Sequence, residues 1–384
     1  MTTATREDLE QIRELARSVA TGRIAPHAAD VDAQARFPTE GYRALVESQL
    51  HAVVIPESFG GVGADALTGA VVAEEIARTC ATTQQVSGAN ELFSWPLLLA
   101  ASEEQKQRWL TPIAAGEALG AFALSEPEAG SDVASMTTRA TPTEDGWWRL
   151  RGTKRWITNG GVADCYVLFA VTDPDAGGRG ISAFVVEKED AGLSFGAPEK
   201  KMGLKGSPTT EIFLDDVVLP ADRLIGGPGE GLKIALGTLD RTRTGVAAQA
   251  IGIAQGALDV AVDYVSTRRQ FGRALAEFQG LQFMLADMAV AVRAARLLTH
   301  TAAEEIETLS PTMGAAGAAA KLFASDTAMR VTTDAVQLLG GAGYVKDFPV
   351  ERMMRDAKIT QIYEGTNQIQ RIVIARDLLR RAAH

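Results

Sequence analysis

From residue 278 to residue 295, apolar side chains recur three or four positions apart. The members of this run are Phe278, Leu281, Leu285, Met288, Val292 and Ala295. Such spacing brings them to one face of a helix that packs lengthwise against other helices. We therefore predict a helical bundle for the part of the chain that follows Gly231.

The sequence pattern changes twice along the chain. Helical spacing of apolar residues begins with Leu9, Ile12, Leu15, Ala16 and Val19, and Ala- and Leu-rich stretches continue to about residue 120. Between residues 121 and 231, short runs at 166–171, 181–186 and 212–214 are typical of strands. The order α, β, α indicates an α+β multidomain protein, with a helical domain at 1–120, a β domain at 121–231 and a helical bundle at 232–384.

Composition narrows the class of protein. The chain has 384 residues, of which 46% are hydrophobic, and this is enough to bury a substantial core in two or three domains. The formal net charge of −10, with Lys and Arg spread along the sequence, argues against nucleic-acid binding. The apolar runs are too short and too often interrupted to cross a bilayer, so we expect no membrane insertion.

The two cysteines and four histidines are scattered. Cys80 and Cys165 are too few for a disulfide framework, so we predict buried thiols in a reducing compartment. The histidines lack metal-ligand spacing, and we predict no metal site. The acidic stretch after Met1 has neither a signal core nor an Arg-rich transit pattern. We expect a cytoplasmic protein, or one in an organelle matrix if a targeting segment has been removed.

Residues 361–371 combine a carboxylate, a glycine and a helix start. Glu364 precedes Gly365, which permits a sharp bend, and Thr366 or Asn367 can cap the helix that follows. Glu364 would then project from an ordered corner, where it could act as a base. Taken alone, the same pattern also fits a surface turn with an ordinary acid.

Two further segments suit a planar, polar ligand. Residues 122–132 break from a small apolar run into hydroxyls, Pro and Gly, which offers backbone N–H groups and short donors. Residues 154–161 place Trp156 beside Thr158 and a glycine turn. Each segment alone could equally be a connection between strands.

Together and in this order, the three segments resemble the acyl-CoA dehydrogenase family. Further segments that fit the family pattern follow in the expected order at 268–272, 278–279, 337–341 and 349–358. The resemblance covers almost the whole chain. It implies a helical N-terminal domain, a central β domain and a C-terminal four-helix bundle.

The resemblance implies α,β-dehydrogenation of a saturated acyl-CoA thioester to a trans-2-enoyl-CoA. Glu364 would abstract the α-proton, its backbone N–H would bind the thioester oxygen, and hydride would pass to flavin N5. Some family members carry the base on a bundle helix, but Thr242 stands at that position here. Asp240 and Arg243 are assigned to the substrate site, although a surface ion pair explains them equally well.

The resemblance also assigns FAD as the cofactor. The cofactor-binding candidates are Phe122, Leu124, Ser125, Ser131, Trp156, Thr158, Arg268, Phe271, Gln279, Gln337, Gly340, Gly341, Thr366 and Gln368. The residues from Arg268 to Gly341 in this set would serve the FAD of a neighbouring subunit. Ser131 and Gly365 are also assigned to the substrate. Phe122 stands where the family often has Tyr, and Ser125 where it often has Thr.

Partners and alternatives follow from the same resemblance. It implies an electron-transferring flavoprotein as electron acceptor and a homo-oligomer, expected as a dimer of dimers. An acyl-CoA oxidase that uses O2, or a catalytically silent flavin-binding scaffold, are the alternative functions. Trp95 falls where the family has a helix that lines the acyl pocket, and we expect a short or branched acyl chain.

Overall fold

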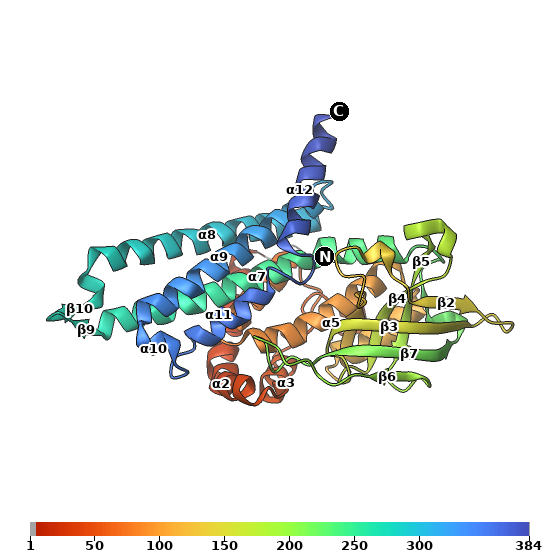
Figure 1. Ribbon diagram of the computed structural model, residues 1–384, viewed down its shortest axis with the longest axis horizontal. Coiled ribbons are helices and arrows are strands. Elements are labelled where there is room, and N and C mark those ends of the chain that lie inside the picture. The colour runs from red at the N-terminus through yellow and green to blue at the C-terminus, as the bar shows by residue number, and fades with distance from the viewer. Residues whose placement is uncertain (1–4, 384) are drawn as a thin grey trace.

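The computed structural model of the chain describes residues 5–383. Residues 1–4 and His384 lie outside it, so the start of the stretch for which we predict no targeting signal is not described. The molecule is elongated, with long helices at one end and a sheet at the other (Figure 1). The order of helices, strands and helices confirms the predicted fold class. The limits at 120 and 231 stay a proposal for where the domains divide.

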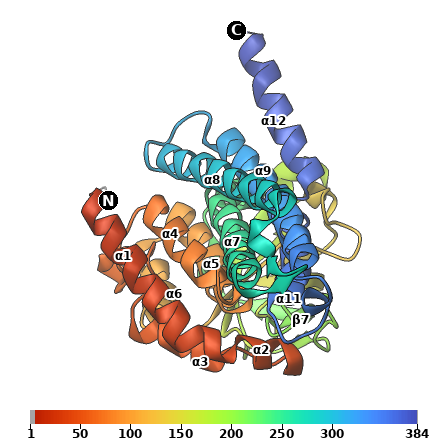
Figure 2. The same cartoon turned by 90° about the vertical axis from the view of Figure 1, so that its left-hand side faces the viewer.

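The N-terminal part is helical. Its α-helices are α1 (Arg6–Val19), α2 (Ala25–Gln34), α3 (Thr39–Glu47), α4 (Ala66–Ala77), α5 (Ala81–Ala100) and α6 (Glu103–Ala114). Helix α1 begins with a capping box, in which the Asp8 N–H donates to Thr5 Oγ1 and the Thr5 N–H donates to Asp8 Oδ2. Ser102 and Gln105 start α6 in the same way. Figure 2 shows α1 across the outside of this part, beside α4.

The central part is a single eight-stranded sheet. Its strands are β1 (Gly120–Ala123), β2 (Arg139–Pro142), β3 (Trp148–Thr158), β4 (Cys165–Val171), β5 (Ile181–Glu187), β6 (Leu193–Phe195), β7 (Thr209–Leu219) and β8 (Leu224–Ile225). The order is β6-β7-β3-β2-β4-β5-β8, and β1 pairs with β4. The β1–β4 and β2–β4 pairs are parallel and the others are antiparallel. One face packs on α5 and α6 through Phe93, Leu97 and Leu110.

The C-terminal part is built on three long helices. Its elements are α7 (Gly231–Thr267), β9 (Arg269–Gln270), β10 (Arg273–Ala274), α8 (Gln279–Glu307), α9 (Met313–Leu339), α10 (Gly341–Tyr344), α11 (Val350–Ile359) and α12 (Asn367–Ala382). Met288, Val292 and Ala295 of the predicted apolar face are buried in the bundle core. Helix α11 lies along the long helices, and α12 projects away from the body (Figures 1 and 2).

Helix α7 runs through the centre of the molecule. A Cβ at Gly252 would lie 2.2 Å from the Glu74 carbonyl oxygen of α4, so glycine allows the two helices to approach closely. By length and apolar composition, α7 is the one helix among residues 5–383 that could cross a membrane. However, 72% of its most apolar window is buried inside the protein, as in a core helix.

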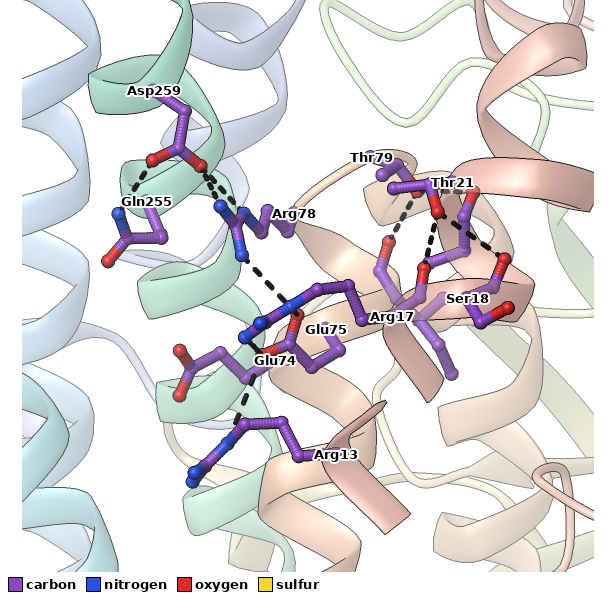
Figure 3. Close-up of polar contacts among 12 residues, drawn as sticks. Arg13, Arg17, Ser18, Thr21, Glu74, Glu75, Arg78, Thr79, Gln255 and Asp259 are labelled. Carbon is purple, nitrogen blue, oxygen red and sulfur yellow. Dashed lines mark hydrogen bonds and ion pairs between the residues drawn. The ribbon is translucent and has the colours of Figure 1, made fainter. Parts of the chain in front are cut away.

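Ion pairs tie the N-terminal helices to the bundle (Figure 3). Glu75 of α4 accepts two hydrogen bonds from the Arg17 guanidinium of α1, at 3.0 and 2.8 Å. Arg78, the C-cap residue of α4, donates to Asp259 of α7 at 2.6 Å, and Gln255 donates to the other oxygen of Asp259 at 2.9 Å. Helix α1 is thereby fixed relative to α7 through charge-assisted bonds.

Both cysteines are buried and unpaired, as predicted. Within the part of the chain that the structure describes, no three His, Cys, Asp or Glu side chains gather in a way that could hold a metal ion.

Candidate active site

The bend predicted at Glu364 lies between α11 and α12. Glu364 has φ 50° and Gly365 has φ 89°, both in the left-handed region. A side chain at Gly365 would be strained, and its Cβ would lie 2.7 Å from Gln370 Nε2. Thr366 caps α12 by accepting a hydrogen bond from the Ile369 N–H at 3.3 Å. A non-glycine residue held at positive φ is uncommon, and such positions gather at functional sites.

The Glu364 carboxyl points to α7. Thr242 Oγ1 donates to Glu364 Oε2 at 3.1 Å, so the residue that the resemblance places at the alternative base position is a hydrogen-bond donor to the predicted base. Burial raises the pKa of Glu364 to about 7, and the nearby Glu91 carboxyl adds to the increase. The Thr242 hydrogen bond and the charges of Arg243 and Lys321 act in the opposite direction. A base with a pKa near the working pH combines ionisation with a strong affinity for the proton.

A buried lysine of α9 binds the bend through hydrogen bonds. Lys321 of α9 is fully buried, and its Nζ donates to the Gly365 carbonyl at 2.8 Å and to Asn367 Oδ1 at 3.0 Å. Asn367 in turn donates to Ser325 Oγ at 2.9 Å. Burial lowers the pKa of Lys321 to about 8, and the Glu364 carboxylate counteracts this. Lys321 therefore anchors the segment after Glu364 to the bundle, at Gly365 and at Asn367.

Tyr363 connects the bend to the N-terminal helices. Its hydroxyl donates to Gln85 Oε1 of α5 at 2.8 Å and also contacts Gln249 Oε1 of α7. Gln249 Nε2 donates to Gln85 Oε1 at 3.2 Å. The three side chains fix the position of the bend relative to α5 and α7.

Several predicted flavin-binding residues come together on the sheet. The Arg155 N–H donates to the Ser125 carbonyl at 2.9 Å, which brings the loop after β1 beside β3. Below it, the fully buried Lys154 Nζ donates to Glu126 Oε1 at 2.8 Å and to the Leu124 carbonyl at 3.2 Å. This buried ion pair anchors both predicted segments to each other.

Trp156 forms an open aromatic surface on β3. It has φ 63°, lies at an irregularity in the pairing of β3 with β7, and is 54% exposed. The Arg155 guanidinium lies 4.5 Å from the indole centroid. Thr158 ends the same strand, Ser131 is exposed, and Phe122 packs on Phe169 at 5.1 Å between ring centroids. A large exposed indole beside hydroxyl groups fits a flat ring system such as flavin.

The other predicted cofactor residues lie at the opposite end of the molecule. Arg268 and Phe271 flank β9, Gln279 begins α8, and Gln337 and Gly340–Gly341 lie where α9 ends and α10 begins. Figure 1 shows β9 and α10 far from β3. Arg268 lines an open hollow of about 720 Å³ and forms no ion pair with any residue from 5 to 383, and Phe271 is 92% exposed. One chain therefore does not gather all the predicted FAD contacts.

The residues assigned to the substrate are mixed in character. Asp240 and Arg243 form an ion pair within α7, and Arg243 is almost fully buried with its Nε unbonded. Arg243 also approaches the Gly314 carbonyl of α9 at 3.4 Å. Gln368, a predicted cofactor-binding residue and not a substrate residue, is exposed on the first turn of α12. The surface ion pair considered from sequence is thus formed, although Arg243 lies inside the protein.

Three residues around Glu364 lie outside the set that the sequence predicts. The sequence identifies Thr242 only as the absence of a second base. Lys321 lies outside the predicted set, although a lone charge within the Ala-rich run from 315 to 325 is a signal of a buried, paired group. Glu91 had no sequence signal, because its place near Glu364 depends on how α5 packs against α7.

Comparisons with known proteins agree with this arrangement. Profiles of the acyl-CoA dehydrogenase N-terminal, middle and C-terminal domains match residues 6–117, 121–217 and 229–379. A probable acyl-CoA dehydrogenase of Mycobacterium leprae is 56% identical over 374 residues, which cover 97% of this chain and 96% of that protein.

Two solved structures are similar over nearly the whole chain. Butyryl-CoA dehydrogenase from Megasphaera elsdenii has a TM-score of 0.95 and 42% identity, covering 99% of this chain and 100% of that one. A chain from a structure described as the electron transferring flavoprotein of Acidaminococcus fermentans has a TM-score of 0.96 and 46% identity, with the same coverage.

The fold and the three matched domains place this chain in the acyl-CoA dehydrogenase family. It is a flavin-dependent oxidoreductase of the acyl-CoA dehydrogenase type.

The pKa of Glu364 sets the expected pH dependence. The carboxyl accepts a proton only when it is ionised, and burial holds its pKa at about 7. We therefore expect kcat/KM to rise with pH, by about tenfold per pH unit on the acidic side, and to level off above about 7. Steady-state rates between pH 5 and pH 9 would measure this. A profile that is flat across that range would contradict the assignment.

Proposed function

We propose that this protein oxidises a saturated acyl-CoA thioester to the trans-2-enoyl-CoA, with Glu364 as the base that removes the α-proton. The observation that carries this proposal is the Glu364 carboxyl itself. It stands on a bend with left-handed backbone, bonded to Thr242, with its pKa raised to about 7 by burial. An ordinary surface acid would have none of these features.

The backbone of the bend provides the second element of catalysis. No hydrogen bond among residues 5–383 uses the Glu364 N–H. A free N–H at this position can donate to the thioester oxygen, and a donor aimed at that oxygen stabilises the negative charge that develops when the α-proton leaves. Thr242 keeps the carboxylate oriented, and Lys321 holds the Gly365 carbonyl in place.

FAD is the cofactor, and when bound it accepts the hydride that leaves the β-carbon. The residues present fit this group. The exposed indole of Trp156 and the Thr158 hydroxyl on β3, with Ser125 and Ser131 in the loop after β1, would hold the flavin end. Thr366 and Gln368 are proposed to contact FAD from the start of α12.

Arg268, with its forked donors and no ion-pair partner in the described chain, would bind the pyrophosphate or adenosine end of a neighbouring subunit's FAD. The same end of FAD would be contacted by the other predicted residues near Arg268, which are Phe271, Gln279, Gln337, Gly340 and Gly341. The separation of these residues from β3 in one chain supports this division between subunits.

We propose a homo-oligomer, a dimer of dimers. Apolar side chains are exposed on α8 and α12, including Phe283, Val290, Leu297 and Leu379. Large exposed apolar patches mark interaction surfaces. A second copy that covers these helices could also bring Arg268 to the flavin site of its partner.

An electron-transferring flavoprotein is the proposed acceptor of electrons from the reduced flavin. The similar structure described by the name of such a protein supports this choice. Acyl-CoA oxidase remains the second candidate, because it shares the same half-reaction. A silent flavin-binding scaffold is the third, and the arrangement of Glu364 and Thr242 counts against it.

We propose a short or branched acyl chain. Trp95, on α5, has its ring 5.4 Å from the Arg241 guanidinium of α7, and a bulky indole there would shorten the space for the acyl group. The similarity to a butyryl-CoA dehydrogenase supports the same range.

Anaerobic titration of the yellow protein with acyl-CoAs of graded length tests cofactor, reaction and preference together. We expect loss of flavin absorbance with short chains and no peroxide when air is admitted. Stoichiometric peroxide would identify an oxidase, and an unchanged flavin spectrum with every acyl-CoA would identify a scaffold. The highest kcat/KM with dodecanoyl-CoA would reject a short-chain site.

The substitution Arg268→Ala tests the divided cofactor site. Loss of a fixed charge that contacts FAD should weaken FAD retention by about tenfold or more and shift the protein to smaller oligomers. FAD release on dilution and analytical ultracentrifugation would measure both effects. Arg43→Ala, at an exposed position on α3, is a matched control. Equal FAD retention in both variants would exclude Arg268 from the cofactor site.

A further inference from the structure

A second carboxyl lies close to the proposed base. Glu91 is on α5 and is partly buried. Trp95 Nε1 donates to Glu91 Oε1 at 3.3 Å, and no ion pair joins Glu91 to any other residue of the described chain. A carboxylate can accept about four hydrogen bonds, so most of the capacity of Glu91 is unused.

The position of Glu91 follows from its contact with α7. An added Cβ at Gly245 would lie 3.9 Å from Glu91 Oε2 and would meet no other atom within 4 Å. Gly245 is three residues after Thr242, and residues so spaced are neighbours on one helix face, about 5–6 Å apart. Glu91 and Glu364 therefore contact the same face of α7 about one turn apart. The Glu91 charge accordingly contributes to the raised pKa of Glu364.

On its other side, Glu91 borders a small hollow of about 30 Å³, enclosed by residues 50–55, α4 and α5. Gln84 and His51 also line it, and they are only 8% and 7% exposed. Gln84 Oε1 and His51 Nδ1 have no hydrogen-bond partner in the protein. His51 Nε2 lies 3.0 Å from the Ala114 carbonyl, so Nε2 carries the proton and Nδ1 is an acceptor.

Gln84 Oε1 and His51 Nδ1 are thus unbonded acceptors beside Glu91, although Ser87 and the Gln84 and Asn90 amides also bring donors to the lining. Trp95 contacts both Glu91 and a cation, Arg241. Arg241 stacks over the Trp95 ring at 5.4 Å and donates to the Gly237 carbonyl at 2.9 Å. A plain alkyl chain that ended here would leave the Glu91 carboxyl poorly solvated, which is unfavourable.

We propose that Glu91 forms the distal end of the acyl site and selects short acyl groups that end in a hydrogen-bond donor, a hydroxyl or an ammonium. This inference rests on the function proposed above. Glu364 would act on the α-carbon, and the end of the chain would lie one helical turn along α7, beside Gly245. The hollow next to Glu91 has room for one water-sized group.

Paired substrates test the proposal in the holoenzyme. The pairs are butyryl-CoA with 4-hydroxybutyryl-CoA, and hexanoyl-CoA with 6-hydroxyhexanoyl-CoA and 6-aminohexanoyl-CoA. We expect the donor-bearing member of at least one pair to have a kcat/KM higher by roughly 10- to 100-fold, the range for a hydrogen bond to a charged group. Rates are measured for the wild type, Glu91→Gln, Glu91→Leu and the control Glu103→Gln, an exposed position on α6.

The variants separate charge from hydrogen bonding. Glu91→Gln should keep the preference for the hydroxyl and lose the preference for the ammonium, since an amide accepts a hydrogen bond without charge. Glu91→Leu should favour the alkyl members, and Glu103→Gln should behave as the wild type. If Glu91→Leu does not fold, the proposal is tested by the ratio of kcat/KM values within each substrate pair, compared between the wild type and Glu91→Gln.

Equal kcat/KM within every pair, with butyryl-CoA oxidised, would overturn the proposal and leave a water as the occupant of the hollow. An unchanged flavin spectrum with every acyl-CoA would instead overturn the proposed function, and this inference with it. A preference for donors that persists in Glu91→Leu would place the selecting group elsewhere.

Discussion

Glu364→Gln is expected to lower kcat by about 10²–10⁴-fold, because an amide cannot accept the α-proton and proton transfer by a positioned base contributes that much. Thr242 can still donate to the amide oxygen, so the bend should keep its conformation. FAD content and melting temperature should therefore remain close to those of the wild type. Single-turnover reduction of the flavin by butyryl-CoA measures the chemical step directly.

Two comparisons make this result decisive. Glu189→Gln changes the same chemical group at an exposed position in the β domain and should leave kcat unchanged. Glu364→Asp keeps the carboxylate but shortens the side chain, and we expect partial activity. If Glu364→Gln turned over within about threefold of the wild type, another acid would have to be the base.

Lys321→Met is expected to damage both stability and catalysis. The substitution removes two hydrogen bonds, to the Gly365 carbonyl and to Asn367, in a fully buried place. Both acceptors keep a second donor, Gln370 Nε2 at 2.8 Å and Ser325 Oγ at 3.2 Å, so we expect a loss of about 1.5–3 kcal/mol in the free energy of unfolding, the value for a hydrogen bond to a charged group. The Lys321 charge also lowers the pKa of Glu364, so its loss should move the acidic limb of the pH–rate profile to higher pH.

Denaturant unfolding and the pH dependence of kcat/KM measure the two effects separately. The shift in pH distinguishes an effect on the base from general destabilisation, which would lower rates equally at all pH values. Lys233→Met, at an exposed position on α7, is the matched control. An unchanged acidic limb in Lys321→Met would remove Lys321 from the environment of the base.

The architecture was readable from the sequence where a local pattern repeats. The apolar spacing at 278–295 predicted a packed helix, and α8 confirms it. The carboxylate and glycine at 364–365 predicted a bend before a capped helix, and the φ values and the Thr366 cap confirm that conformation. Both features depend on neighbours within a few residues, which a sequence shows directly.

Contacts between distant segments were not readable. Thr242 and Glu364 are separated by 122 residues, and their hydrogen bond requires α7 and the bend to be in place. The same is true of Lys321 beneath Gly365 and of Glu91 beside Gly245. Periodicity reports which face of a helix is buried, but it does not report which partner covers that face.

The Thr242–Glu364 contact has an evolutionary consequence. Two segments far apart in the sequence, a long helix and a loop, reach the same point in space. Proton removal depends on where a carboxylate oxygen lies and not on which segment holds its Cα. Because Thr242 Oγ1 and Glu364 Oε2 lie 3.1 Å apart, a carboxylate at position 242 would reach the same point as the Glu364 carboxyl, and exchanging the two side chains would move the acid from one segment to the other.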